Sequence, residues 1–167
     1  MNYYRELINR NLQKGILLDT TPLLLLIVGL YDKEWIKKFK HTNNEFSERD
    51  YYILEGLVSR FDKIVTTPNI LTEACNLLGQ APERIKVDFL AVLKILSKRF
   101  MERYRSSKKL CKQKYFTKFG LTDSLIIEDA KDKYLVLTTD FALAGYLQKL
   151  GADVINFNYI RFEEITQ

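Results

Sequence analysis

One arrangement occurs twice in the first half of the sequence and limits the folds open to the chain. A short apolar segment is followed by threonine, proline and a longer stretch with apolar residues at helical spacing, at residues 15–30 and 63–78. A buried strand accounts for each short segment, and proline is favoured in the first turn of a helix. Thr21 and Thr67 are then the expected helix N-caps. The arrangement therefore predicts a strand followed by a helix, twice.

The rest of the chain continues this alternation. Apolar spacing predicts helices at 48–61, from Pro82 to about Tyr104, and at 123–131 with Thr122 as the cap. Strands are predicted at 134–138 and 153–157, separated by a helix that begins at Asp140. Strands that alternate with helices are joined by crossover connections and pair in parallel. We therefore predict an α/β fold of three layers, α/β/α, with a central parallel sheet of about four strands.

The length and composition predict one domain, 1–167. The chain has 167 residues, 47% of them apolar, which is enough to bury a core and too few residues for separate modules. Its most apolar stretch, 15–31, is interrupted by Asp19 and Pro22 and falls short of the roughly 20 residues that a membrane span needs. The N-terminus shows no signal-peptide pattern. We therefore expect a cytoplasmic protein with no membrane partner.

Positive charge is concentrated in residues 94–118, a basic insertion within this domain. Ten lysines and arginines against Glu102 give it a net charge of +9, so the rest of the chain carries −4. A basic stretch on a mildly acidic body favours a polyanionic partner, RNA first. The residues expected to bind RNA phosphates are Lys98, Arg99, Arg103, Lys108 and Lys109. Aromatic residues among the lysines, such as Tyr115 and Phe119, either stack on unpaired bases or pack on the core.

Four carboxylates occupy positions that should converge. Asp19 ends the first strand and Asp140 ends the strand at 134–138, while Asp123 lies in the first turn of a helix. Ligand sites of open parallel sheets lie beyond the carboxyl ends of the strands, where these three residues fall. Glu73 lies within its helix on the border of the face that carries Ile70, and a carboxylate turned toward a core is costly unless paired or bound to metal. We therefore predict one acidic site.

The chemistry of such a site follows from its ligands. Four oxygen donors without His or Cys suit Mg²⁺ or Mn²⁺, and phosphodiester hydrolysis needs a cation that both neutralises phosphate and activates water. Structural roles compete with this interpretation. Asp140 can serve as a helix N-cap, Asp123 can complement a helix dipole, and Glu73 can be an exposed helix residue. Asp19 is left without a cap role if Thr21 is the cap.

At these residues the sequence resembles the PIN domain family. The matching segments, in the order of the family's motifs, are Leu18-Asp19-Thr20-Thr21-Pro22-Leu23, Thr67-Pro68-Asn69-Ile70-Leu71-Thr72-Glu73, Gly120-Leu121-Thr122-Asp123 and Leu137-Thr138-Thr139-Asp140. The resemblance spans about residues 15–158 and implies a Mg²⁺- or Mn²⁺-dependent endoribonuclease that prefers single strands. It implies that Asp19, Glu73, Asp123 and Asp140 are both metal ligands and catalytic residues, with support from Thr20 and Thr139.

Other functions remain to be weighed. A haloacid-dehalogenase-like phosphatase needs a second Asp where Thr21 stands, and a response-regulator receiver needs an acidic pair that is not evident. A catalytically inactive module of the same fold that binds RNA or protein is the main rival, although a binder of a polyanion gains nothing from an acidic pocket. The resemblance also leaves open the toxin of a toxin–antitoxin pair, with an acidic antitoxin-like partner, and a homodimer.

Overall fold

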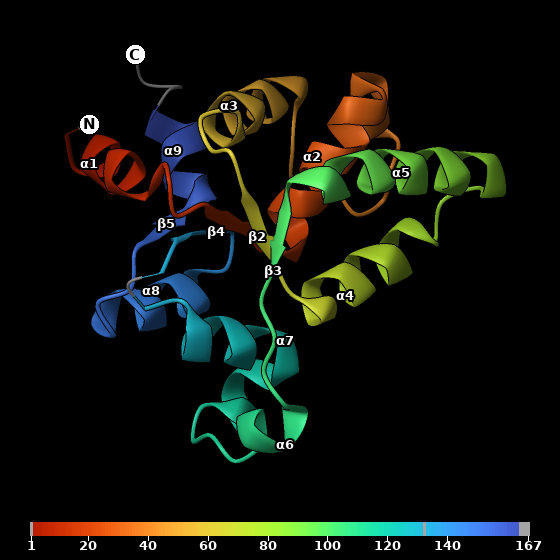
Figure 1. The fold of residues 1–167 in the computed structure, drawn as a ribbon. Coiled ribbons are helices and arrows are strands. Elements are labelled where there is room, and N and C mark those ends of the chain that lie inside the picture. The colour runs from red at the N-terminus through yellow and green to blue at the C-terminus, as the bar shows by residue number, and fades with distance from the viewer. Residues whose placement is uncertain (1, 132, 164–167) are drawn as a thin grey trace.

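Five parallel strands form the centre of the fold (Figure 1). A computed structural model describes residues 2–131 and 133–163. The strands lie in the spatial order β3-β2-β1-β4-β5, and they are β1 (Ile16–Leu18), β2 (Ile64–Thr66), β3 (Phe100–Glu102), β4 (Leu135–Thr138) and β5 (Val154–Asn156). Leu17 of β1 lies opposite Val65 on one side and Val136 on the other. The predicted α/β class and parallel sheet are confirmed, with one strand more than expected.

Helices cover both faces of this sheet. They are α1 (Asn2–Asn11), α2 (Thr20–Tyr31), η1 (Lys33–Lys37), α3 (Glu48–Val58), α4 (Pro68–Leu78), α5 (Glu83–Leu96), η2 (Ser97–Arg99), α6 (Ser107–Leu110), α7 (Phe116–Asp129), α8 (Phe141–Lys149) and α9 (Phe157–Glu163). Right-handed crossovers place the helices between β1 and β3 on one face and those leading to β4 and β5 on the other. Accordingly α2 packs against α3, α4 and α5, whereas α7 packs against α8 (Figure 1). The predicted three layers are confirmed.

The fifth strand lies where a helix was predicted. The helix predicted from Pro82 to about Tyr104 ends at Leu96, and the chain turns through η2 into β3. Two observations explain the difference. Phe100 pairs with Ile64 along the edge of β2, and the Arg99 guanidinium donates to two carbonyl oxygens at the end of α3. Backbone pairing with an open strand edge therefore overrides a helical spacing of side chains, which is a weak local preference.

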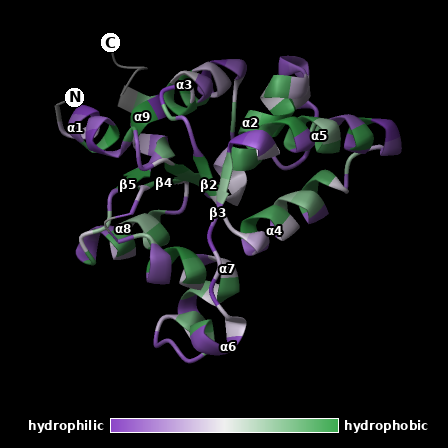
Figure 2. Cartoon of the chain, in the orientation of Figure 1, coloured by the Kyte–Doolittle hydropathy of each residue, from purple (hydrophilic) through white to green (hydrophobic). Residues whose placement is uncertain are grey.

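The strands supply most of the centre of the core. Every residue of β1, β2, β4 and β5 is buried, as expected for a parallel sheet covered on both faces. Figure 2 shows apolar residues along these strands and along the inner sides of the helices. Within the described part of the chain, no helix is both long enough and apolar enough to cross a membrane.

The strand order reverses between β1 and β4. The chain steps from β1 outward to β2 and β3, and then returns to place β4 and β5 on the other side of β1. Where the order reverses, the connections after two neighbouring strands leave in opposite directions and open a crevice at the carboxyl ends of those strands. The fold therefore positions a ligand site just beyond β1 and β4.

Candidate metal centre

Asp19 lies directly after β1 at this crevice. Its backbone N–H donates to the carbonyl of Leu137 at 3.0 Å, so the pairing of β1 with β4 continues up to this residue. Its carboxylate accepts from the N–H of Thr20 at 2.7 Å and from the Thr138 hydroxyl at 2.6 Å. Asp19 is thus the N-cap of α2, and the prediction that Thr21 caps this helix is wrong. The helix begins two residues earlier because the Asp19 carboxylate satisfies a free N–H of its first turn.

Asp140 lies beyond β4, the strand next to β1. One of its carboxylate oxygens accepts from the N–H groups of Ala142 at 2.6 Å and Leu143 at 2.9 Å, so Asp140 caps α8. The hydroxyl oxygen of Thr138 accepts from the Asp140 N–H at 3.0 Å while its hydrogen goes to Asp19. A single threonine side chain therefore connects the two acidic residues across the strand boundary.

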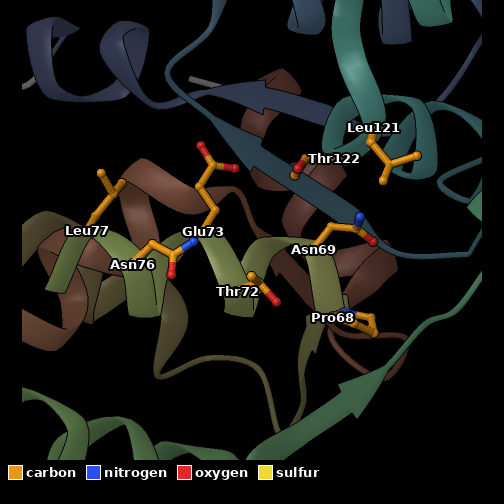
Figure 3. A pocket seen from close by; sticks show the side chains of 8 residues that line it. All are labelled: Pro68, Asn69, Thr72, Glu73, Asn76, Leu77, Leu121 and Thr122. Carbon is orange, nitrogen blue, oxygen red and sulfur yellow. The ribbon is translucent and has the colours of Figure 1, made fainter. Parts of the chain in front are cut away.

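Glu73 reaches the same place from α4. The Thr20 hydroxyl donates to its carboxylate at 3.2 Å, next to the Asp19 cap. Ile70 and Ala74 are buried as expected, but Glu73 is exposed, so the expectation that its carboxylate turns toward the core is wrong. The side chain stands above α4 and borders a cavity (Figure 3). Glu73 is therefore a solvent-accessible carboxylate oriented by Thr20.

Asp123 comes from α7, the helix that enters β4. A kink at Gly120 divides α7 into two helical segments, and the second segment carries Thr122 and Asp123 and runs to Asp129. This segment begins directly after Gly120, just before the predicted start, so Thr122 lies within it and the prediction that Thr122 is the cap is wrong. Gly120 has φ 73° and ψ −172°, a conformation that only glycine adopts readily. The break redirects the chain, so that the following turn carries Asp123 toward the carboxyl edge of the sheet.

The four carboxylates, called here the carboxylate cluster (Asp19, Glu73, Asp123 and Asp140), share one electrostatic environment. Burial raises the pKa of Asp123 to about 7, and the charges of the other three carboxylates act in the same direction. Burial also raises the pKa of Asp19, against the opposing hydrogen bonds from Thr138 and Thr20. No lysine or arginine in the described ranges forms an ion pair with any of the four. The cluster is thus a concentration of negative charge without a protein counter-ion.

A divalent cation fits this donor set by its chemistry. All of the charged donors are carboxylate oxygens, which Mg²⁺ and Mn²⁺ prefer, and a cation there would remove the repulsion among them. Among residues 2–131 and 133–163, no three His, Cys, Asp or Glu side chains stand ready as a metal site. Like-charged groups repel one another, and the caps and hydroxyl bonds hold three of the four in place. Closing the cluster around one cation would therefore require side chains of the cluster to move.

No family model, curated protein or solved structure matches the chain. The resemblance to PIN domains therefore stays a prediction that depends on the motifs. The geometry of the carboxylate cluster is independent of it, because strand order, hydrogen bonds and charge all come from the structure itself.

Thr138 is the supporting residue of the candidate site that sequence reasoning missed. Thr20 and Thr139 were the expected supporting residues, and Thr20 does contact Glu73 and Asp19. The supporting hydroxyl behind Asp19 and Asp140, however, belongs to Thr138, whereas the Thr139 carbonyl accepts from the Asn156 and Asn158 side chains. The available signal was that Thr138 ends its strand directly beside Asp19 once β1 and β4 are paired.

The basic segment 94–118 is divided by the fold. Lys98 precedes β3, on the side of the amino ends of the strands. Lys108 and Lys109 follow β3, on the side of the carboxyl ends. All three lysines are exposed. Arg99 and Arg103 instead make internal contacts, with the carbonyls after α3 and with Asp129 respectively. The lysines near α6 are therefore the ones that share an edge with the carboxylate cluster.

The aromatic residues of this segment pack inward. Tyr115 and Phe119 contact the ring of Tyr146 on α8, with centroid separations of 5.9 Å and 5.2 Å. The Tyr115 hydroxyl also donates to Glu128. These contacts favour the packing interpretation over base stacking for both residues.

Replacing Gly120 with Ala is expected to displace Asp123 and to lower the free energy of unfolding by about 1–2 kcal/mol. A Cβ at this position would meet no atom within 4 Å, so the cost comes from the backbone conformation alone. Gly145→Ala is the matched control, because its Cβ also meets nothing and its backbone is helical. Chemical denaturation should show loss for the first variant and no loss or a small gain for the second. Equal stability of the two variants would contradict a strained break at Gly120.

Divalent metal is expected to stabilise the folded protein. Binding to the native state alone adds about 2.5 kcal/mol at a metal concentration roughly 70-fold above Kd. For a chain of this size that corresponds to a rise in Tm of roughly 5–10 °C. Thermal unfolding in EDTA and in millimolar Mn²⁺ measures the rise, and Asp123→Asn should reduce it. An unchanged Tm in Mn²⁺ would count against the carboxylate cluster as a metal centre.

Proposed function

We propose that this chain is a Mg²⁺- or Mn²⁺-dependent endoribonuclease of the PIN-like kind. The observation that carries the proposal is the carboxylate cluster, which gathers four acidic side chains from four separate connections at the point where the strand order reverses. Helix capping explains the position of Asp19 and of one carboxylate oxygen of Asp140. It does not explain Asp123, which caps no helix. A cluster of negative charge costs folding energy, so its presence favours a cation-dependent function.

The side chains have distinct roles in this proposal. Asp19, Glu73, Asp123 and Asp140 would hold the cation, which when bound neutralises phosphate charge and lowers the pKa of water. Thr138 orients Asp19 and the backbone of Asp140, and Thr20 orients Glu73. The caps at the starts of α2 and α8 fix two of the carboxylates on rigid elements, which keeps the reacting groups in register with the substrate.

The lysines around α6 are the proposed route for the RNA backbone. Lys108 and Lys109 lie on α6, which packs against α7, the helix that carries Asp123. Figure 1 shows α6 beyond α7 at the carboxyl edge of the sheet. A cationic approach next to an acidic centre lets phosphates bind beside the metal while the lysines leave the carboxylates free for the cation.

Replacing Lys108, Lys109 and Lys112 together with Ala is expected to weaken RNA binding. Each lost phosphate contact should lower the slope of log K against log salt by roughly one unit. Lys94→Ala with Lys98→Ala is the matched control, because both lysines are exposed and precede β3 at the opposite edge. Fluorescence anisotropy at several salt concentrations measures both quantities. If the control loses as much affinity as the triple variant, RNA does not follow the α6 side.

Cleavage of a labelled single-stranded RNA in Mn²⁺ and in EDTA tests the proposed activity. Loss of full-length RNA in Mn²⁺ alone is the expected result.

A further inference from the structure

A cavity of about 390 Å³ adjoins the carboxylate cluster on the side of α4. It lies between the outer face of α4 and the turn of α7 that follows Gly120, and Glu73 forms part of its wall (Figure 3). This volume falls in the range of roughly 300–1,000 Å³ that is usual for small-molecule sites. Because Glu73 belongs to both the cavity and the carboxylate cluster, a group bound here would be next to the reacting centre.

Apart from Glu73, the polar lining of the cavity consists of neutral groups. They are the side chains of Asn69, Thr72, Asn76 and Thr122. Figure 3 shows the two asparagines on α4 on either side of Glu73, about two helical turns apart. Within the described ranges, neither asparagine amide has a hydrogen-bond partner in the protein. Each amide offers two donors and an acceptor, so the cavity presents unused hydrogen-bonding capacity of both kinds.

The rest of the lining is apolar and determines what kind of group fits. Pro68, Leu77 and Leu121 supply the apolar surface, and no lysine or arginine lines the cavity. A phosphate is a poor occupant of the cavity itself, because the lining has no lysine or arginine to offset its repulsion by Glu73. A flat group with an apolar face and a polar edge suits the lining, and nucleobases have that character.

We infer that this cavity binds the unpaired base of the nucleotide adjoining the cleaved phosphodiester, with Asn69 and Asn76 as specificity-determining residues. The inference rests on the proposed ribonuclease function. Glu73 belongs both to the cavity wall and to the carboxylate cluster, so a base in the cavity would lie next to the cleaved bond. An asparagine amide pairs with the N6 amino group and N7 of adenine through one acceptor and one donor, the pairing with a base edge that is typical of asparagine, so adenine is the base assigned to the cavity. A base in a duplex has its pairing edge occupied and its faces stacked, so the substrate must be single-stranded at this position.

Binding of nucleosides without metal tests the cavity independently of cleavage. In EDTA, adenosine is titrated into the ¹⁵N-labelled wild-type protein, with ribose 5-phosphate as the compound that lacks a base. Adenosine should shift the side-chain amide signals of Asn69 and Asn76, and Asn69→Ala with Asn76→Ala should weaken its binding at least fivefold. Ribose 5-phosphate should cause no such shifts. Equal shifts from both compounds, or none from adenosine, would overturn the inference.

Mapping of cleavage sites on a random-sequence RNA pool separates this inference from the proposed function. The wild type should cut with a preference for adenine beside the cleaved bond, and the double asparagine variant should cut with that preference reduced at least fivefold. Asn43→Ala with Asn44→Ala, in the loop before α3, is the control and should keep the preference. Cutting without base preference would overturn the base site and leave the ribonuclease standing. No cutting, with adenosine still bound, would overturn the ribonuclease and its cleaved bond, and would leave only an adenine-binding cavity.

Discussion

Asp19→Asn is expected to lower metal-dependent RNA cleavage at least about 1,000-fold, which corresponds to roughly 4 kcal/mol of activation free energy. The asparagine keeps the size of the side chain and an oxygen that can accept from Thr20, so the N-cap of α2 survives. It removes one negative charge from the carboxylate cluster, and metal affinity falls with it. Repulsion toward phosphate falls as well, so RNA binding should stay the same or become tighter.

Asp32→Asn is the matched control for this variant. Asp32 also caps a helix, η1, with its carboxylate accepting from the Glu34 N–H at 2.9 Å, and it lies at the far end of α2 from Asp19. Cleavage rates and RNA affinity are measured for both variants at equal protein concentration, with circular dichroism to check the fold. Full activity of Asp19→Asn would mean that the cleavage comes from elsewhere on the molecule or from another nuclease.

Asp129→Asn is expected to have the largest effect on stability, a loss of about 3 kcal/mol in the free energy of unfolding. The Asp129 side chain is fully buried, and Arg103, Arg105 and Lys133 form ion pairs with it at 2.5–2.7 Å. The Tyr134 hydroxyl adds a donor at 3.3 Å. Removing the charge leaves the cations without their common partner. A fall in Tm of roughly 6–12 °C should follow.

The stability that Asp129 contributes should depend on pH. Burial acts to raise the pKa of Asp129, but the hydrogen bonds from Arg103 and Lys133 outweigh it and the pKa is lowered. A carboxyl group whose pKa is lower in the folded state contributes fully above its unfolded pKa of about 3.9, and the contribution is lost as pH falls through the folded value. The stability difference between wild type and Asp129→Asn should therefore stay constant above about pH 5 and shrink in stronger acid.

Asp62→Asn, at an exposed position after α3, is the control and should change stability by less than about 0.5 kcal/mol. Denaturant unfolding of the three proteins between pH 3 and 8 measures all of these quantities. A loss for Asp129→Asn no larger than that of the control would show that the ion pairs around Asp129 do not hold α7 against the segment after β3.

Elements with strong local signals were predictable from the sequence. Helix α4 begins at Pro68 and ends before Gly79 as expected, because a threonine cap, a proline in the first turn and a following glycine all favour the same boundaries. The strands β1, β2, β4 and β5 are bounded by such signals too. Strand β3 was not predictable, because it exists only through pairing with β2, and its residues continue the spacing of the preceding helix.

The carboxylate cluster was predictable as a set of residues and less so as a geometry. Strand ends and helix starts located Asp19, Asp123 and Asp140, since parallel strands bring their carboxyl ends to one edge. The role of Asp19 as a cap was missed because Thr21-Pro22 offers a competing cap. The bond from Thr138 was missed because it depends on the register of β1 with β4, which no local pattern reports.

Incubation of the purified protein with unstructured and structured RNA, in Mn²⁺, Mg²⁺ or EDTA, tests the central claim most directly. A ribonuclease with a metal centre at the carboxylate cluster should cut the unstructured RNA in Mn²⁺ or Mg²⁺, cut the structured RNA much less, and leave both intact in EDTA. Undiminished cutting in EDTA, or RNA that is bound but uncut in every condition, would contradict the claim. The second of these results would instead support an RNA-binding module of the same fold.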